Sequence, residues 1–532
     1  MACYLFSVQN LDSVRICQVS YIGVVLALLC LALTLYLRRH VPATDLTPPG
    51  PSKLPILGNI HQIPKKNIWK VYQSWHQSFG PLIYTQFGQL AVISIGSFKV
   101  AKDLLNKRSS IYSSRPQFSA ANRINQGLHT ALLPYGDRLR VHQALLTAVL
   151  CPRIVQDYQY LQDIESCQLL HELLCPSPSK VGFQALAHRY TYSVTLTLAY
   201  GRRLATSSED LIRRINHLGT SVAENIHKPT SLMVDVIPAL KWLPRMLATW
   251  RVEGDHLFAE SLELFEELLH YGILQRSWNW AKATTRLNDE RRYHLSRREL
   301  AFMLGSLLEA SDTTDKVLEF FVMACVLHKQ AVHCAQKELE SVVGPNRLPN
   351  FDDAPSLPYV NAFVQEVMRW RPITPLGMPH AVVQDDEYHG YHIPKGAMVL
   401  PNNWSMNFDP EVYDQPEDFR PERWLQDANL PLNAFGFGKR ICPGQHLGRR
   451  SLFIVASRIL WAFDISEAVG ADGNIRDIDP SDLLQSALTG PASLEASFIV
   501  RSPDRKRIIE DAFHSVDFDV HSTMRRVSLE RV

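Results

Sequence analysis

The pattern of hydrophobic and polar positions divides the body of the chain into strand-like and helical parts. Residues 82–95 alternate and are rich in β-branched side chains, which predicts a hairpin that turns at Gly88. Apolar residues then recur with helical spacing, most clearly over 256–275 and 298–343. After Arg371, proline-rich irregular stretches alternate with short strands. This pattern predicts a mainly α fold with minor β, of the α+β class, built as one large domain.

A different pattern stands near the start of the chain, where residues 19–37 are apolar and carry no charge. About 20 such residues form a helix that spans the hydrocarbon core of a bilayer. A cleaved signal peptide is the competing interpretation, but the run is long for one, and Arg38 and Arg39 follow it in place of small residues. A buried core helix is the third. Basic residues are more frequent after the run than before it, which favours a transmembrane anchor with a cytosolic body behind a short segment 1–18.

The rest of the chain divides by composition. Residues 38–59 are basic and then proline-rich, and proline excludes helix and stiffens the chain. We interpret them as a hinge that holds the body against the bilayer, although a solvated linker has the same composition. The body extends over 60–507. The mixed, charged residues 508–532 form a C-terminal tail, and the sequence after Pro503 is typical of a partly disordered segment.

Charge and cysteine content narrow the function. The 532 residues include 55 basic and 53 acidic side chains spread along the chain, which argues against a nucleic-acid-binding protein. Nine cysteines occur without any C-x-x-C pair, so neither a disulfide framework nor a zinc ribbon is indicated. We expect a reducing compartment in which most cysteines are small buried side chains.

One cysteine has a special setting, in the segment from Phe435 through Gly438 and Arg440 to Cys442 and Gly444. The glycines permit a tight turn and a close approach of backbone to a flat ligand. The guanidinium and the start of a predicted helix, over residues 445–463, would help to stabilise a thiolate. These features describe a cysteine prepared as a single anionic ligand. A buried structural cysteine in a glycine-rich turn is the alternative.

The segment resembles the F-x-x-G-x-R-x-C-x-G haem-binding signature of the cytochrome P450 family. The resemblance implies the cytochrome P450 fold and haem b (iron protoporphyrin IX), with Cys442 as the axial ligand of the haem iron. It also implies that Phe435, Gly438 and Gly444 shape the haem loop and that Arg440 pairs with a haem propionate.

Further segments are similar to motifs of the same family. Glu366 and Arg369 lie three residues apart on one helical face, which alone indicates only a solvated ion pair. Arg423, in a segment resembling the family's P-E-R-F, would join them in a structural charge network. His380 resembles the strand position that often contacts a propionate.

The run Leu304–Thr314 resembles the family's A-G-x-D-T-T segment, which crosses the distal face of the haem. The resemblance implies that Asp312 and Thr313 are catalytic and relay protons during oxygen activation. By matching the family's recognition segments, we expect Glu309, Thr374 and Leu376 to contact substrate. Further polar side chains in these segments are Arg115, Arg123 and His129.

The chain also departs from the family pattern. Leu139 and Gln143 replace the Trp and Arg of the helix whose W-x-x-x-R binds a propionate, and Arg138, Arg140 or His142 could substitute. The usual glycine before Ser311 is missing: Ala310 occupies its place, and a one-residue deletion aligns equally well. Asp315 follows the threonines where a small residue is common.

The resemblance implies a haem-thiolate monooxygenase that inserts one oxygen atom from O2 into an apolar organic substrate. The alternatives are an isomerase, dehydratase or oxidative coupling enzyme, or a decayed non-catalytic haem protein. With no flavin module or G-x-G-x-x-G fingerprint in the chain, electrons from NADPH would come through a separate NADPH-cytochrome P450 reductase, with cytochrome b5 as a further donor. Segments beginning at Tyr200 and Ile393 resemble those of fungal membrane-bound members of secondary metabolism, of the O-methylsterigmatocystin oxidoreductase type, which implies single-pass anchoring in the endoplasmic reticulum membrane.

Overall fold

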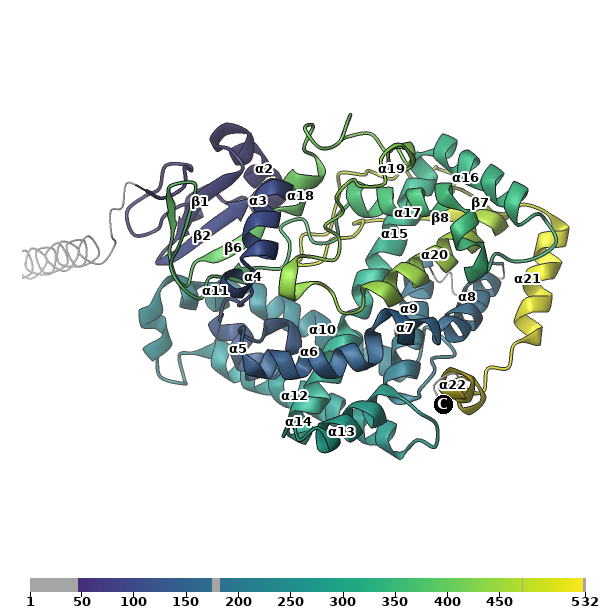
Figure 1. Cartoon of the computed structure of the whole chain (residues 1–532), viewed down its shortest axis with the longest axis horizontal. Helices are drawn as coiled ribbons and strands as arrows, with labels where there is room; N and C mark the ends of the chain where they lie inside the picture. Colours follow the sequence, from purple (N-terminus) through teal and green to yellow (C-terminus); the bar gives the residue numbers. More distant parts are fainter. Residues whose placement is uncertain (1–45, 175–181, 471, 530–532) are drawn as a thin grey trace, which may run out of the picture.

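The computed structural model describes residues 46–174, 182–470 and 472–529 (Figure 1). The anchor expected at 19–37 lies outside these residues. Within them, no single helix is long and apolar enough to cross a membrane. On length and composition alone, only the stretch Arg297–Leu327 together with Lys329–Val342 passes, as a pair bent by 103°.

Helices form most of the described chain. The α-helices are α2 (Ile68–Phe79), α3 (Phe98–Ala101), α4 (Ser109–Tyr112), α5 (Ser119–Asn125), α6 (Asp137–Leu150), α7 (Pro152–Gln156), α8 (Gln159–Leu174), α9 (Phe183–Tyr200), α10 (Asp210–His227), α11 (Pro229–Val236), α12 (Thr249–Leu274), α13 (Trp280–Glu290), α14 (Arg297–Glu309), α15 (Ser311–Leu327), α16 (Lys329–Val342), α17 (Pro358–Trp370), α18 (Asn403–Asn407), α19 (Glu422–Gln426), α20 (Gln445–Ala462), α21 (Pro503–Ser515) and α22 (Val520–Leu529). Short 3-10 or π-helical turns are η1 (Ile60–Gln62), η2 (Lys102–Lys107), η3 (Thr130–Leu132), η4 (Pro238–Trp242), η5 (Phe351–Ser356) and η6 (Gly438–Arg440).

The strands form one four-stranded sheet and two short ribbons. They are β1 (Leu82–Phe87), β2 (Leu90–Ile95), β3 (His380–Ala381), β4 (Asp386–Tyr388), β5 (Tyr391–Ile393), β6 (Met398–Pro401), β7 (Phe463–Glu467) and β8 (Ala496–Val500). The larger sheet has the order β1-β2-β6-β3, and β4-β5 and β7-β8 are separate pairs. Figure 1 shows this sheet at one end of the molecule and the helices filling the rest. The α+β class predicted from the sequence is confirmed.

The predicted hairpin is present. β1 and β2 are antiparallel and pair Phe87 with Leu90, so the chain turns at Gly88 as expected. Gly88 has φ +58°, and a Cβ there would lie 2.4 Å from the carbonyl oxygen of Val236. Glycine is therefore required both for the turn and for the close approach of the segment that ends α11.

The centre of the helical part is α15, which packs against α9, α17 and α20. Its residues are buried almost all round from Val317 to Val326, as expected for a core helix without an apolar-polar stripe. The two helices that carry most of the candidate chemistry, α15 and α20, therefore lie side by side in the core.

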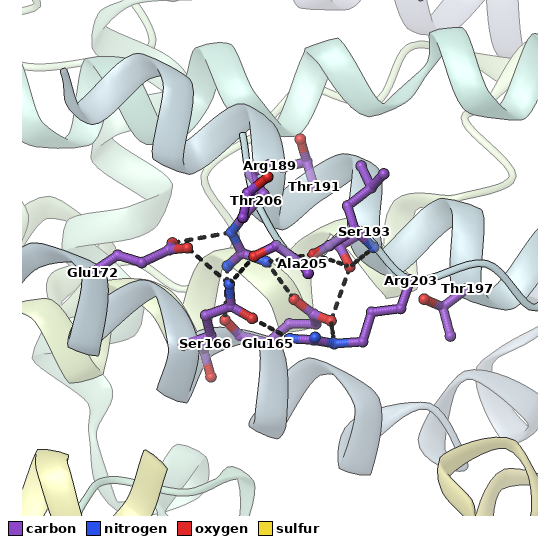
Figure 2. A network of polar contacts seen from close by, with 12 residues as sticks. Glu165, Ser166, Glu172, Arg189, Thr191, Ser193, Thr197, Arg203, Ala205 and Thr206 are labelled. Atoms are coloured by element: carbon purple, nitrogen blue, oxygen red, sulfur yellow. Dashed lines mark hydrogen bonds and ion pairs between the residues drawn. The ribbon is translucent and has the colours of Figure 1, made fainter. Parts of the chain in front are cut away.

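A buried charge network joins α8 to α9 (Figure 2). Arg189 Nη1 lies 2.6 Å from Glu165 Oε2, and both side chains are fully buried. Although burial opposes it, the charges of Glu165 and Glu172 raise the pKa of Arg189. Arg203 Nε lies 2.7 Å from the second oxygen of Glu165. Two guanidiniums thus meet two carboxylates, which offsets the desolvation of each.

The end of the described chain docks on this network, so the partial disorder expected after Pro503 is wrong. α21 packs along α8, where the Phe513 ring stacks on His171 with ring centres 3.9 Å apart. Phe518 lies under the Arg203 guanidinium at 4.2 Å. Most charged side chains of this segment face solvent, with Arg505 buried, whereas its aromatic residues contact the body of the protein.

Candidate functional site

The Cys442 loop is held mainly by its backbone. The Cys442 N–H donates to the Phe435 carbonyl oxygen at 2.8 Å, and the Gly438 N–H donates to Asn106 Oδ1 at 2.7 Å. Gly438 has φ +54°, and a Cβ there would lie 2.1 Å from the carbonyl oxygen of Leu105. No other residue fits at this position, because the loop lies directly against η2.

Cys442 is half-buried and lies just before the start of α20. Burial raises its pKa, and a hydrogen bond from the backbone of Gly444 partly opposes this. A bound metal cation would reverse the balance and hold the sulfur as a thiolate. The guanidinium of Arg440, expected to help, instead donates from Nε to the Ser113 carbonyl oxygen at 2.7 Å and also to that of Leu133.

The buried guanidinium of Arg115 and the half-buried guanidinium of Arg440 lie near one another. Burial lowers the pKa of Arg115 to about 9, helped by the charge of Arg440, and burial lowers the pKa of Arg440 to about 10. Arg115 donates to the carbonyl oxygens of Ala131, Met378 and Pro379. Across residues 46–174, 182–470 and 472–529, neither guanidinium is paired with a carboxylate. Buried cations of this kind require an anion, and the two propionates of a haem provide one for each.

His380 lies beside the same pair. Its Nδ1 is 2.7 Å from the Tyr112 carbonyl oxygen, so Nδ1 carries the proton and Nε2 has the lone pair. Burial lowers the pKa of His380 to about 3, with Arg115 as the next cause. The strand position predicted from the sequence therefore does join the cationic group formed by Arg115 and Arg440.

None of the three side chains considered as substitutes in α6 reaches this group. Arg138 pairs with Glu299 at 2.7 Å, and Arg140 pairs with Asp137 on the surface. His142 is buried, with its Nδ1 2.9 Å from Thr130 Oγ1. From the sequence, Arg115 is only a polar side chain in the segments expected to contact substrate, and its place beside Arg440 was missed. The only local feature of Arg115 in the sequence is that it directly precedes a proline.

The other departures in α6 also have an explanation. Gln143, in place of the usual arginine, donates from Nε2 to the Lys439 carbonyl oxygen in the haem loop at 2.7 Å. Leu139 is 1% exposed and belongs to the core. α6 therefore supports the loop by a neutral hydrogen bond and by packing.

The helical segment that carries Asp312 and Thr313 breaks at Ala310 although no glycine is present. α14 ends at Glu309 and α15 begins at Ser311, and the Thr313 N–H bonds back only three residues, to the Ala310 carbonyl oxygen at 3.2 Å. The Thr313 hydroxyl donates to the same oxygen at 2.7 Å. Side-chain hydroxyls that bond to a backbone carbonyl bend helices, so threonine here supports the break.

Asp312 and Thr313 do not share a hydrogen bond. Asp312 Oδ1 accepts from the Tyr192 hydroxyl at 2.8 Å and lies 3.7 Å from His188 Nε2. Burial raises the pKa of Asp312, and the Tyr192 hydrogen bond partly opposes this. The carboxyl is therefore fixed from α9, and Tyr192 is a second residue that the sequence analysis missed.

Asp315 extends the same cluster. It is 2% exposed, its Oδ1 has no hydrogen-bond partner within the described chain, and Lys316 lies 3.8 Å from its other oxygen. Burial and the charge of Glu319 raise the pKa of Asp315 well above its ordinary value. Ligand atoms of His188, Asp312 and Asp315 lie within 4.8 Å of one another. Burial thus favours the protonated form of both carboxyls, against the charge of Lys316, whereas it lowers the pKa of His188 to about 4 and favours the neutral imidazole.

The helix break and the cysteine loop meet across α20. A Cβ at Gly448 would lie 3.7 Å from Thr314 Oγ1 and 3.8 Å from the Phe435 ring. α15 therefore passes next to the helix that begins just after Cys442. The thiol and the threonines, predicted as parts of one site, are brought to the same region.

The predicted charge network is complete and larger than expected. Arg369 binds both carboxylate oxygens of Glu366, at 2.8 and 2.9 Å, and Arg423 Nε lies 3.1 Å from Oε1. Trp424 Nε1 also donates to Oε2 at 2.9 Å. Arg369 further donates to the carbonyl oxygens of residues 407, 416 and 418. The network thus holds the irregular segment before the haem loop in place by hydrogen bonds to its backbone.

The three side chains expected to contact substrate have different surroundings. Thr374 is held in a turn by the Asn403 side chain, which donates to its carbonyl oxygen at 2.9 Å. Leu376 is partly buried against two hydrophobic clusters. Glu309 Oε2 lies 2.7 Å from His129 Nε2. Of the other polar candidates, Arg123 pairs with Asp255.

Comparison with known proteins identifies the family. The Cytochrome P450 family model matches residues 48–491. The cytochrome P450 monooxygenase peniB of Penicillium patulum is 43% identical over 472 residues, covering 89% of this chain and 88% of that protein. The cytochrome P450 monooxygenase FrzL of Cladobotryum sp is 41% identical over 513 residues, covering 96% and 98%. The cytochrome P450 monooxygenase aneD of Aspergillus aculeatus is 42% identical over 485 residues, covering 90% and 93%. On this match and on the geometry of the Cys442 loop, the chain belongs to the cytochrome P450 family.

Proposed function

We propose that this cytochrome P450 is a haem-thiolate monooxygenase that inserts one atom of O2 into an apolar organic molecule in fungal secondary metabolism. The observation that carries the proposal is the placement of Cys442 at the start of α20, next to the broken helix that bears Thr313. Curated relatives at 36–43% identity are named cytochrome P450 monooxygenases, which supports the same activity here.

The residues of the site fit a haem. Cys442 would supply the thiolate ligand of the iron, and the guanidiniums of Arg115 and Arg440, which have no carboxylate partner in the described residues, would provide counter-charges for two propionates. When bound, the haem iron supplies the redox chemistry that activates O2. Burial raises the pKa of Asp312, which favours proton uptake at this carboxyl, and the Tyr192 hydroxyl of α9 fixes its position by donating to Oδ1. The Thr313 hydroxyl donates its proton to the Ala310 carbonyl oxygen, so its Oγ1 is able to accept a hydrogen bond and position a water.

The electron donor would be an NADPH-cytochrome P450 reductase, with cytochrome b5 as a further donor. Lys439 and Arg449 are exposed beside the Cys442 loop, and Arg450 is half-buried there. None of the three forms an ion pair with a carboxylate in the described part of the chain. A basic surface of this kind attracts an acidic partner, and it lies where the distance to the thiolate is short.

Exposed apolar side chains support our proposal that the protein is attached to a membrane. Trp242 and Met246 are 88% and 92% exposed in the segment after α11, and Ile56 and Leu57 are exposed near the start of the described chain. The two segments lie near one another, because Gly58 bridges to Phe87 and the next residue, Gly88, touches Val236. Clustered exposed apolar residues of this kind fit a lipid surface, consistent with a cytosolic body anchored to the endoplasmic reticulum membrane.

The carbon-monoxide difference spectrum of the reduced protein tests the proposal. We expect the strongly red-shifted band of a thiolate-ligated haem, and Cys442→Ala should abolish that band. NADPH-dependent oxygen use in the presence of a reductase, with formation of an oxygenated product, would distinguish a monooxygenase from an isomerase or dehydratase. An unshifted band in the native protein would favour a decayed haem protein.

A further inference from the structure

One carboxylate on the helix-break side is not used by the cluster around Asp312. Glu309 ends α14, directly before the exposed Ala310, and its Oε2 lies 2.7 Å from His129 Nε2. The Glu309 side chain is 40% exposed, whereas that of His129 is 16% exposed. Within the described residues, the other oxygen of Glu309 has no hydrogen-bond partner. One oxygen is therefore committed to the protein and the other is open.

The segment that carries His129 also reaches the haem-loop arginines. Two residues further on, the Ala131 carbonyl oxygen accepts from Arg115, and the Leu133 carbonyl oxygen accepts from Arg440. η3, in this segment, packs on α14. The segment 129–133 therefore contacts Arg115 and Arg440 through its carbonyl oxygens and, through His129, the last residue of α14 before the helix break.

The hydrogen bonds of His129 fix its tautomer. The Ala131 N–H donates to His129 Nδ1 at 3.2 Å, so Nδ1 carries a lone pair. The ring proton is then on Nε2 and is donated to Glu309. A neutral imidazole that donates to a carboxylate leaves the pair with a full negative charge. The pair thus differs from a salt bridge, because no cation within it balances Glu309.

We propose that the open oxygen of Glu309 recognises a hydrogen-bond donor, an N–H or O–H group, on an otherwise apolar substrate. His129 is the positioning residue that fixes the carboxylate through its other oxygen. This inference rests on the proposed monooxygenase function and narrows its substrate class. A donor anchored at Glu309 would hold one end of the molecule and leave a C–H bond elsewhere in it beside Thr313.

The expected selectivity follows from the cost of an unmatched polar group. When a ligand displaces water from Glu309 without offering a donor, the carboxylate loses hydration and gains nothing. Sites built around a hydrogen bond therefore reject analogues that lack the group more strongly than apolar pockets reject a missing methyl group. We expect a preference of about tenfold, which corresponds to about 1.4 kcal/mol.

Ligand-induced shifts of the haem absorption band in the full-length holoenzyme measure the preference without turnover. The probes are two matched pairs, 1-adamantanol with 1-methyladamantane, and protonated N,N-dimethyl-1-adamantylamine with 1-isopropyladamantane. In the native protein each donor should bind about tenfold more tightly than its hydrocarbon partner. Comparing the two pairs separates a neutral donor from a cationic one.

Variants test whether the preference for a hydrogen-bond donor comes from Glu309 and His129. Glu309→Gln keeps the shape and should remove the preference for the ammonium probe while retaining part of that for the alcohol. Glu309→Leu should remove both. His129→Phe should reduce both about threefold, and His129→Gln, which retains an N–H donor, should restore them. Glu290→Gln on the surface of α13 is the matched control and should change neither ratio.

The outcomes are distinct. Equal binding of donor and hydrocarbon by the native protein, or a preference unchanged in Glu309→Leu, would overturn the inference. Because each result is a ratio measured at equal haem content, a variant that folds less well does not mimic a loss of preference. Oxidation of the probes by NADPH and a reductase is followed in parallel. A donor preference without oxidation would contradict the monooxygenase proposal and leave the recognition by Glu309 intact.

Discussion

The Cys442 side of the site and the helix-break side carry opposite excess charge. On the Cys442 side, the buried Arg115 and the half-buried Arg440 have no carboxylate partner in the described residues, and the Glu366 network holds two guanidiniums for one carboxylate. On the other side, Lys316 is the only cation that contacts the Asp315 and Glu319 carboxyls within the described chain.

The difference indicates what each side is built to hold. Buried cations favour anions such as propionates and a thiolate, whereas buried carboxyls with raised pKa values favour protons. A site that binds an anionic cofactor on one face and delivers protons on the other needs this separation. The predictions below test each side in turn, from the largest expected effect to the smallest.

The largest effect is expected at the centre of the Glu366 network. Glu366→Gln leaves Arg369 and Arg423 buried without a counter-charge, which should lower the free energy of unfolding by about 3–5 kcal/mol. Thermal unfolding and haem content of the purified protein measure it. The exposed Glu411→Gln should leave both unchanged. A network variant with native haem content would mean that the backbone contacts of this region suffice.

A variant of Arg115 should separate haem binding from stability. Arg115→Leu removes a propionate counter-charge, so haem should dissociate about tenfold to a hundredfold more readily. The same change removes an uncompensated buried charge, so the haem-free protein should be no less stable than the native one.

Transfer of haem to apomyoglobin measures the dissociation, with Arg138→Gln as the surface control. Because Arg115 already serves the propionate, Gln143→Arg in α6 should bring no gain in haem retention. A gain in haem retention in Gln143→Arg, or native haem retention in Arg115→Leu, would indicate that α6 binds the propionate and Arg115 does not.

The smallest expected effect is a pH-dependent gain in stability when Asp315 is replaced. Its folded pKa is raised by burial and by Glu319, so the folded carboxyl holds its proton more tightly than the unfolded one. Stability is therefore unaffected below the ordinary pKa, about 4, and falls as the pH rises from there towards the folded pKa.

The asparagine of Asp315→Asn cannot ionise. At pH 8 the variant should therefore have a free energy of unfolding higher than that of the native protein by on the order of 1 kcal/mol, and should unfold at a higher temperature. The two should coincide near pH 4. Thermal melts across this range measure the difference. A constant offset at all pH values would show that the effect comes from packing and not from ionisation.

Sequence reasoning found what local motifs encode and missed what distant segments provide. The Cys442 loop and the Glu366–Arg369 pair were predictable because their residues are adjacent or share one helical face. Arg115, Tyr192 and His129 act on groups far away in sequence, so no spacing rule relates them to the site. The sequence shows that the usual glycine before Ser311 is missing, but not that the helix breaks at Ala310 without it, where the Thr313 hydroxyl bonds to the Ala310 carbonyl.

The docking of α22 has a practical consequence for handling the protein. Met524 and Val527 are fully buried, and the Arg526 guanidinium stacks over the Tyr160 ring at 4.5 Å. Together with Phe518 under Arg203, these contacts cover the ion pairs between α8 and α9. Trimming the chain before α21 for easier crystallisation would strip this cover and let water reach Glu165 and Arg189. Affinity tags are better joined through a spacer after residue 529 than grafted onto these last helices.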